Sequence, residues 1–183
     1  RCLSRALMRE HELDHLIDFD FADSAKRSVL MDSDAGLRTA SLVSALLLRD
    51  ALRRVALAPQ VAALQRHLGA PLLAQVLRAN DVLPKLAHPP AGLLDVAELL
   101  QPSDDTQLWP RRTARLWLAM VPAAALGTMR RLRLKLPLAW RTLEAWRLGD
   151  TERRQIGALF AAVTPRAAPE WAWLHASQGA PAS

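Results

Sequence analysis

The fold prediction begins with residues 113–140, which read TARLWLAMVPAAALGTMRRLRLKLPLAW. Its first part, 116–126, is the longest nearly uninterrupted apolar run in the chain, and no charged residue follows until Arg130. An apolar run without charge predicts a helix that is buried on several sides. We therefore expect Leu116, Trp117 and Met120 to lie in the hydrophobic core.

The second part of the stretch changes its period. Leucines at 132, 134, 136 and 138 alternate with Arg131, Arg133, Lys135 and Pro137. This alternation is typical of a half-exposed extended segment. We call residues 131–137 the basic ledge and expect them to form at most one short extended segment. The ledge is either a solvated edge, as most charge runs are, or a surface for a partner.

Helices separated by proline and glycine are predicted before this stretch. Residues 37–58 carry apolar side chains on several sides, and Leu47 and Leu52 are expected in the core. A further helix is predicted to begin at Pro59, to bury Leu64 and to stop at Gly69, because proline fits a first turn and glycine a left-handed end.

Shorter elements are predicted around these helices. Ser33 or Asp34 is the expected N-cap of the helix over 37–58, and Pro71 is expected to begin another helix. After the ledge, 143–148 is predicted to be helical. A last helix is predicted to follow Gly149 and to stop at Pro165.

The predicted fold class is all-α, because no strand pair with a hairpin turn and no internal repeat is visible. We expect a compact multi-helix globular domain with proline-rich connectors, one of them at 83–92. The 183 residues are expected to form a single domain, 1–183, with a loosely packed tail over 165–183. The chain begins with Arg1, which suggests a truncated N-terminus.

The net charge of +6 and the pI near 10.8 raise nucleic-acid binding as an alternative function. Of 24 basic residues, only Lys26, Lys85 and Lys135 are lysine, and the arginines are scattered outside 130–135. An excess of Arg, Ala, Leu and Pro is typical of a GC-rich coding bias, which supplies basicity without a binding role. No recognised nucleic-acid module can be placed on the sequence, so we expect no nucleic-acid partner.

One motif suggests a zinc metalloprotease as a minor alternative. The residues His11-Glu12-Leu13-Asp14-His15 match H-E-x-x-H, in which two imidazoles bind zinc and the glutamate is the general base. A catalytic zinc needs a third protein ligand, and no H-E-x-x-H-x-x-G-x-x-H extension follows. We therefore reject His11, Glu12 and His15 as a metal site and expect no cofactor.

Other signs of catalysis are also missing from the sequence. No G-x-S-x-G elbow and no glycine-rich phosphate loop occurs, so we predict that the chain is not an enzyme. Cys2 is the only cysteine, which fits a reducing compartment. The run over 116–126 is much shorter than the roughly 20 residues of a membrane span, so no direct membrane insertion is expected.

The order and spacing of four segments resemble the SctK family of type III secretion systems, whose members include YscK, PscK, OrgA and MxiK, and most closely the YscK and PscK branch. The likeness extends from about residue 37 to residue 163. A Leu-Arg-Phe-Cys-Pro-like motif of the family's N-terminal segment is absent. The segments are LLLRDALRRV (46–55), VAALQ (61–65), LWLAM (116–120) and RRLRLKLPL (130–138).

The resemblance implies a non-enzymatic adaptor of the cytoplasmic sorting platform of the injectisome. Such an adaptor joins the cytosolic domain of the inner-membrane ring protein SctD to the pod protein SctQ, with an indirect link to SctL and to the ATPase SctN. It implies a place in the bacterial cytoplasm, peripheral at the inner-membrane base.

The resemblance also gives the ledge a possible role. Our hypothesis is that Arg131, Arg133 and Lys135, with Trp140 and Trp146 beside them, contribute to a partner surface, because indoles and charges are frequent at interfaces. The alternative is a structural edge without a partner.

Overall fold

The computed structural model describes residues 9–10, 24–79, 92–93, 95–101 and 103–175. Every regular element in these ranges is helical, which confirms the all-α prediction. The helices are α2 (Ser24–Arg27), η1 (Ser28–Leu30), α3 (Ser33–Leu47), α4 (Arg49–Leu52), α5 (Ala58–Leu68), α6 (Ala70–Arg78), α7 (Ala97–Leu100), α8 (Leu108–Met120), α9 (Leu126–Lys135), η2 (Leu138–Trp140), α10 (Asp150–Ala167) and η3 (Pro169–Leu174).

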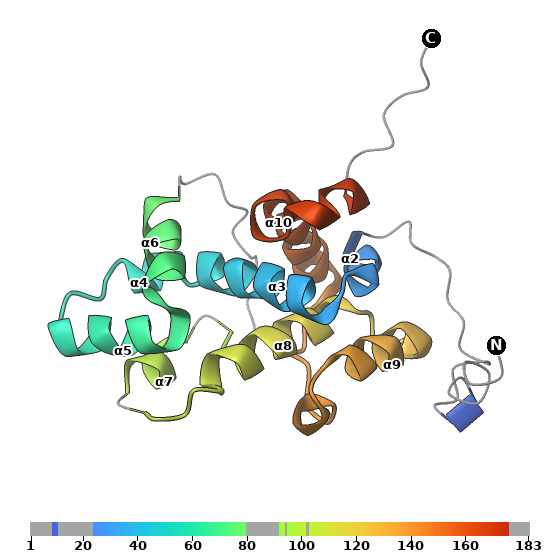
Figure 1. Ribbon diagram of the computed structural model, residues 1–183, viewed down its shortest axis with the longest axis horizontal. Helices are drawn as coiled ribbons and strands as arrows, with labels where there is room; N and C mark the ends of the chain where they lie inside the picture. Colours follow the sequence, from blue (N-terminus) through green and yellow to red (C-terminus); the bar gives the residue numbers. More distant parts are fainter. Residues whose placement is uncertain (1–8, 11–23, 80–91, 94, 102, 176–183) are drawn as a thin grey trace, which may run out of the picture.

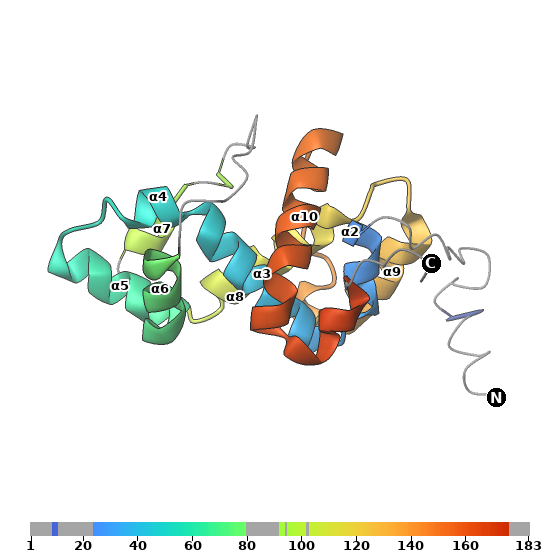
Figure 2. The same ribbon diagram turned by 90° about the horizontal axis from the view of Figure 1, so that it is seen from above.

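Helix α3 is the central element, and α6, α8 and α10 all pack against it. Figure 1 shows α6 and α10 on the upper side of α3 and α8 below it, while α5 and α9 lie at opposite ends of the molecule in Figures 1 and 2. The N-cap of α3 is Asp32, whose carboxylate accepts a hydrogen bond of 2.8 Å from the Ala35 backbone N–H. The expected caps, Ser33 and Asp34, lie inside the first turn instead.

The predicted helix over 37–58 is divided at Leu48, a single turn residue between α3 and α4 whose N–H still donates to the Ser44 carbonyl over 3.2 Å. Helix α4 then ends at Leu52. The predictions for the next two helices are confirmed, since Pro59 and Pro71 lie in the first turns of α5 and α6. Gly69 ends α5 with a φ of 81°, a conformation that favours glycine.

The core is built mainly by α3, α8 and α10. Leu52, Leu64, Leu116, Trp117 and Met120 are buried, while Leu47 is only half-buried because α3 turns it toward the edge of the core. Helix α8 begins two residues before Pro110 and stops at Met120. The core helix therefore ends before 126, because Pro122 has no N–H to continue it.

Three local predictions after α8 are wrong. Residues 131–135 belong to helix α9, and only Leu136 and Pro137 have extended backbone angles. Residues 143–148 are not helical, and Gly149 precedes α10 rather than ending a helix. Pro165 lies inside α10, which continues to Ala167.

The segment expected as a loose tail is packed over 165–175. Ala168 and Leu174 are buried, and η3 folds back on α10. The Trp171 indole N–H donates to the Asp32 carboxylate over 3.2 Å, which ties η3 to the start of α3. Residues 176–183 lie outside the described part of the chain.

Candidate functional site

Basic side chains hold the ends of helices in this fold. Arg53 donates to the carbonyls of Leu77 and Ala79 at the end of α6, over 3.2 and 3.1 Å. Arg38 donates to the Ala167 carbonyl at the end of α10. The last carbonyls of a helix lack intrahelical donors and carry partial negative charge, so cations stabilise them. Much of the basicity of this chain is therefore used inside the fold.

Two of the three basic ledge residues have this structural role. The Lys135 ammonium donates to the carbonyls of Val29, at 2.6 Å, and of Leu30 and Met31 at the end of η1. Arg133 donates to the carbonyls of Arg141 and Leu143 after η2. Burial lowers the pKa of Lys135, and the Coulombic attraction of Asp32 opposes that shift. Arg133 and Lys135 therefore donate mainly to backbone carbonyls of this chain, which leaves few of their N–H groups for a partner.

Trp140 and Trp146, the two tryptophans of the partner-surface hypothesis, have different surroundings. Trp146 lies under Arg115, whose guanidinium carbon is 3.8 Å from the ring centroid, and its indole nitrogen is buried without a partner in the described residues. Arg115 also donates to the Glu144 carbonyl, and the Trp146 backbone N–H donates to the Arg115 carbonyl, so contacts with α8 hold the non-helical segment over 143–148. Trp140 is half-buried in η2 against the core.

Arg131 differs from the other two basic residues of the ledge. It forms no ion pair or hydrogen bond with the described residues, and it lines a hollow of about 350 Å³ together with Val29, Leu30, Thr128, Leu134 and Lys135. We call this hollow the α9 surface. Leu126 at the start of α9 and Leu138 at the start of η2 are 56% and 77% exposed. The α9 surface therefore combines one free cation with apolar side chains.

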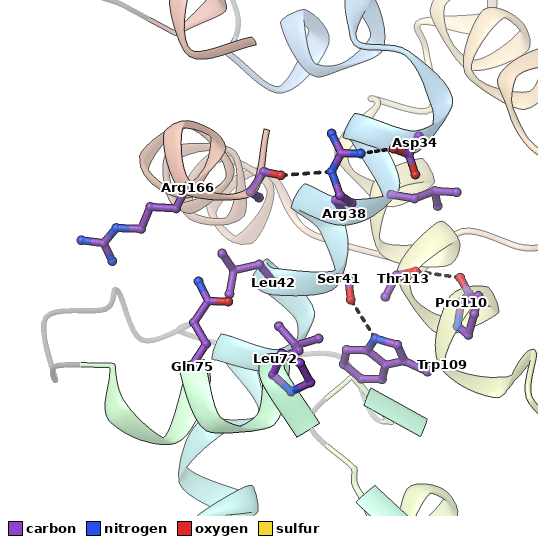
Figure 3. A pocket seen from close by; sticks show the side chains of 13 residues that line it. Asp34, Arg38, Ser41, Leu42, Leu72, Gln75, Trp109, Pro110, Thr113 and Arg166 are labelled. Carbon is purple, nitrogen blue, oxygen red and sulfur yellow. Dashed lines mark hydrogen bonds and ion pairs between the residues drawn. The ribbon is translucent and has the colours of Figure 1, made fainter. Parts of the chain in front are cut away.

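A second concave region lies between α6 and α10 on the upper side of α3. Two hollows, of about 460 and 830 Å³, share Leu42, Pro71, Gln75 and Arg166, so they are continuous. We call this region the α3 groove. Figure 3 shows its first part, with Arg166 of α10 and Gln75 of α6 on opposite sides and Leu42 of α3 between them.

Polar contacts close one end of the α3 groove. Arg38 forms ion pairs with Asp34 and with Glu170, the latter at 2.6 Å (Figure 3 shows the Asp34 pair). The Trp109 indole N–H donates to the Ser41 hydroxyl over 2.8 Å, and Trp109 is buried. These contacts fix the side chains at that end before any partner binds.

The sequence did not reveal the α3 groove, because it is built by three helices that are far apart in the chain. Arg78 and Arg166 are each a single arginine in the last turn of a helix, and no local pattern distinguishes them from the other arginines. The small residues Ala74 and Ala162 give no signal of their own either.

The rejected metal residues His11, Glu12 and His15 lie outside the described residues. Over the ranges that the structure describes, no three His, Cys, Asp or Glu side chains come together as a metal site. Both ring nitrogens of His175 are buried without a hydrogen-bond partner there, and burial lowers the pKa of this imidazole. Among the helices described, none is long and apolar enough to cross a membrane.

Comparison with protein-family models gives a match. The model of the family described as YOP proteins translocation protein K (YscK) matches residues 1–175, which is nearly the whole chain. Neither a curated protein nor a solved structure matches. The match is to the family as a whole and does not distinguish its branches. The chain therefore belongs to the YscK family, the SctK family of type III secretion systems.

Proposed function

We propose that this protein is a non-enzymatic adaptor of the type III secretion sorting platform. It links the cytosolic domain of an SctD-type ring protein to an SctQ-type pod protein, and through SctQ to SctL and the ATPase SctN. It acts in the bacterial cytoplasm at the inner-membrane base of the injectisome. Membership of the YscK family supports the secretion role.

The observation that carries the adaptor role is the α9 surface. Arg131 has no partner in the described part of the chain, and it borders a hollow with Leu30 and Leu134. Leu30 is 40% exposed, although most large apolar side chains here are buried. Exposed apolar residues beside a free cation are typical of a protein interface, where the charge steers encounter and the apolar contacts supply affinity.

Within the basic ledge, we assign the partner contact to Arg131 alone. Arg131 is the residue that contacts a partner, whereas Arg133 and Lys135 keep α9 and η1 in place. Trp140 packs against the core from η2, and Trp146 lies under Arg115 of α8. A combined replacement of the three basic residues would therefore disturb folding as well as binding.

The test uses Arg131→Glu, with Arg66→Glu as the matched control. Arg66 is exposed on α5, at the other end of the molecule, and has no ion pair among the described residues. Each purified variant is mixed with SctQ and, separately, with the SctD cytosolic domain. We expect Arg131→Glu to weaken capture of one partner about tenfold, because a charge reversal replaces attraction by repulsion, and Arg66→Glu to change neither.

The adaptor role itself is tested by co-purification of all three proteins. A single complex that contains SctD, this protein and SctQ is expected. Capture of only one partner, or of neither, would exclude the adaptor role. If both partners bind and Arg131→Glu has no effect, the adaptor role stands and the α9 surface is not the contact.

A further inference from the structure

We propose that the α3 groove binds an amphipathic helix of a partner protein. The helix places its apolar face on α3 and directs acidic side chains at Arg78 and Arg166. This site is distinct from the α9 surface and does not depend on the adaptor role.

The floor and walls of the groove suit a helix. Leu42 and Leu46 of α3 form the floor, and Leu159 and Val163 of α10 continue it on one side. The walls carry the small residues Ala74, Ala79 and Ala162. Small wall residues allow the backbone of a docked helix to approach, while the leucines receive its apolar side chains.

The charges of the groove select an acidic partner. Arg78 ends α6 and Arg166 lies near the end of α10, so the two arginines come from opposite walls. Both are exposed, and neither forms an ion pair or hydrogen bond with the described residues. The described residues that line the larger hollow include no Asp or Glu. Negative side chains on both flanks of the helix would complement this arrangement.

The dimensions limit the length of the bound segment. The wall helix α6 has 9 residues, which corresponds to roughly 13 Å at the rise of an α-helix. A partner helix of about three turns would cover it, with apolar residues at i, i+3 or i+4 and i+7. The Arg38 contacts with Asp34 and Glu170 bound the groove at one end.

The probe for this proposal is a pair of synthetic helical peptides. Both carry leucines at i, i+3, i+4 and i+7, and they differ only in having glutamates or lysines on the flanks. Binding of each labelled peptide to the full chain is measured by fluorescence anisotropy. We expect the glutamate peptide to bind at least tenfold more tightly than the lysine peptide, and this preference to decrease as salt is added.

Three variants distinguish the site from non-specific attraction. The double variant Arg78→Glu/Arg166→Glu should bind the glutamate peptide about tenfold more weakly than the parent chain does, and the lysine peptide more tightly. Ala162→Trp should fill the groove and weaken the binding of both peptides. Arg131→Glu should leave the preference unchanged, which separates this site from the α9 surface. Residues 78, 162 and 166 are exposed, so the variants are expected to fold, and circular dichroism checks this.

Several results would overturn the proposal. One is equal binding of the two peptides, or no binding of the glutamate peptide. Another is unchanged binding in the folded Arg78→Glu/Arg166→Glu variant. Loss of SctQ or SctD capture by Arg131→Glu has no bearing on it.

Discussion

Replacing Gly36 by alanine should destabilise this protein, although alanine is the better helix former. Gly36 lies in α3 where the indole of Trp117 from α8 crosses it. A Cβ at position 36 would lie 2.6 Å from Cζ3 of Trp117 and closer still to Cη2 and Cζ2. Real Cβ contacts are essentially never below 3.0 Å, so either α3 or the indole must move.

The indole has little room to move. Trp117 is fully buried, and its Nε1–H donates to the Ser28 hydroxyl over 3.2 Å. Overpacking of a core costs about 1–3 kcal/mol, and the propensity gain of alanine offsets about 1 kcal/mol. Since three ring atoms clash at once, we take the upper part of the overpacking range and expect the free energy of unfolding to fall by about 2 kcal/mol in total.

The measurement is equilibrium unfolding in urea, followed by circular dichroism. A double-mutant cycle adds Trp117→Phe, which removes the outer ring of the indole. We expect Gly36→Ala to cost less in that background, with a coupling energy of at least about 1 kcal/mol. The control is Ala158→Gly at an exposed position of α10. It should lower the free energy of unfolding by about 1 kcal/mol, because glycine is a poorer helix former than alanine.

Two results would refute this reasoning. Gly36→Ala could be as stable as the parent chain, or the cycle could be additive within about 0.5 kcal/mol. Either result would mean that α3 and α8 are not in the close contact on which the core depends.

Two further predictions concern charged side chains. Asp32→Ala should cost about 1 kcal/mol at neutral pH by removing the N-cap of α3. The Ala35 N–H bond lowers the pKa of Asp32, so its stabilisation should be present above pH 3.8 and be lost as pH falls further, whereas Asp32→Asn should not titrate. Lys135→Met should cost about 1 kcal/mol at pH 7 by removing the donors to the end of η1. Because burial lowers the pKa of Lys135 below 10.5, the unfolded chain binds more protons there. The parent chain should therefore gain stability relative to Lys135→Met as pH rises toward 10.5 in urea titrations, and a pH-independent difference would contradict this.

Three helix ends were predictable because they depend on local backbone chemistry. Proline at 59 and 71 suits a first turn, where no backbone N–H is needed, and Gly69 tolerates a positive φ. The buried run over 116–120 needs only its own composition to be placed in the core. Membership of the family was also visible in the order of such local segments.

The basic ledge shows why the rest was not predictable. Leu132 and Leu136 are both buried, four residues apart, so the same alternation that fits a strand also fits one face of a helix. Contacts with η1 and α3 decide between a strand and a helix. The Lys135 ammonium donates to the Val29 carbonyl of η1, and the Ser33 hydroxyl of α3 donates to the Lys135 carbonyl, so the end of α9 is held by residues about one hundred positions earlier in the chain. The candidate site depends on the same kind of information, because which arginine is free is a property of its surroundings.

The all-α class, the first turns at Pro59 and Pro71, most of the expected core residues and the family were predictable from the sequence alone. Contacts between distant residues were needed to establish that 131–135 is helical, that 143–148 is not helical, and that Arg133 and Lys135 donate to carbonyls of their own chain. This difference between what could and could not be predicted arises because helix signals act over one turn of chain. The pairing of a cation with a carbonyl depends on residues that only the folded chain brings within about 3 Å.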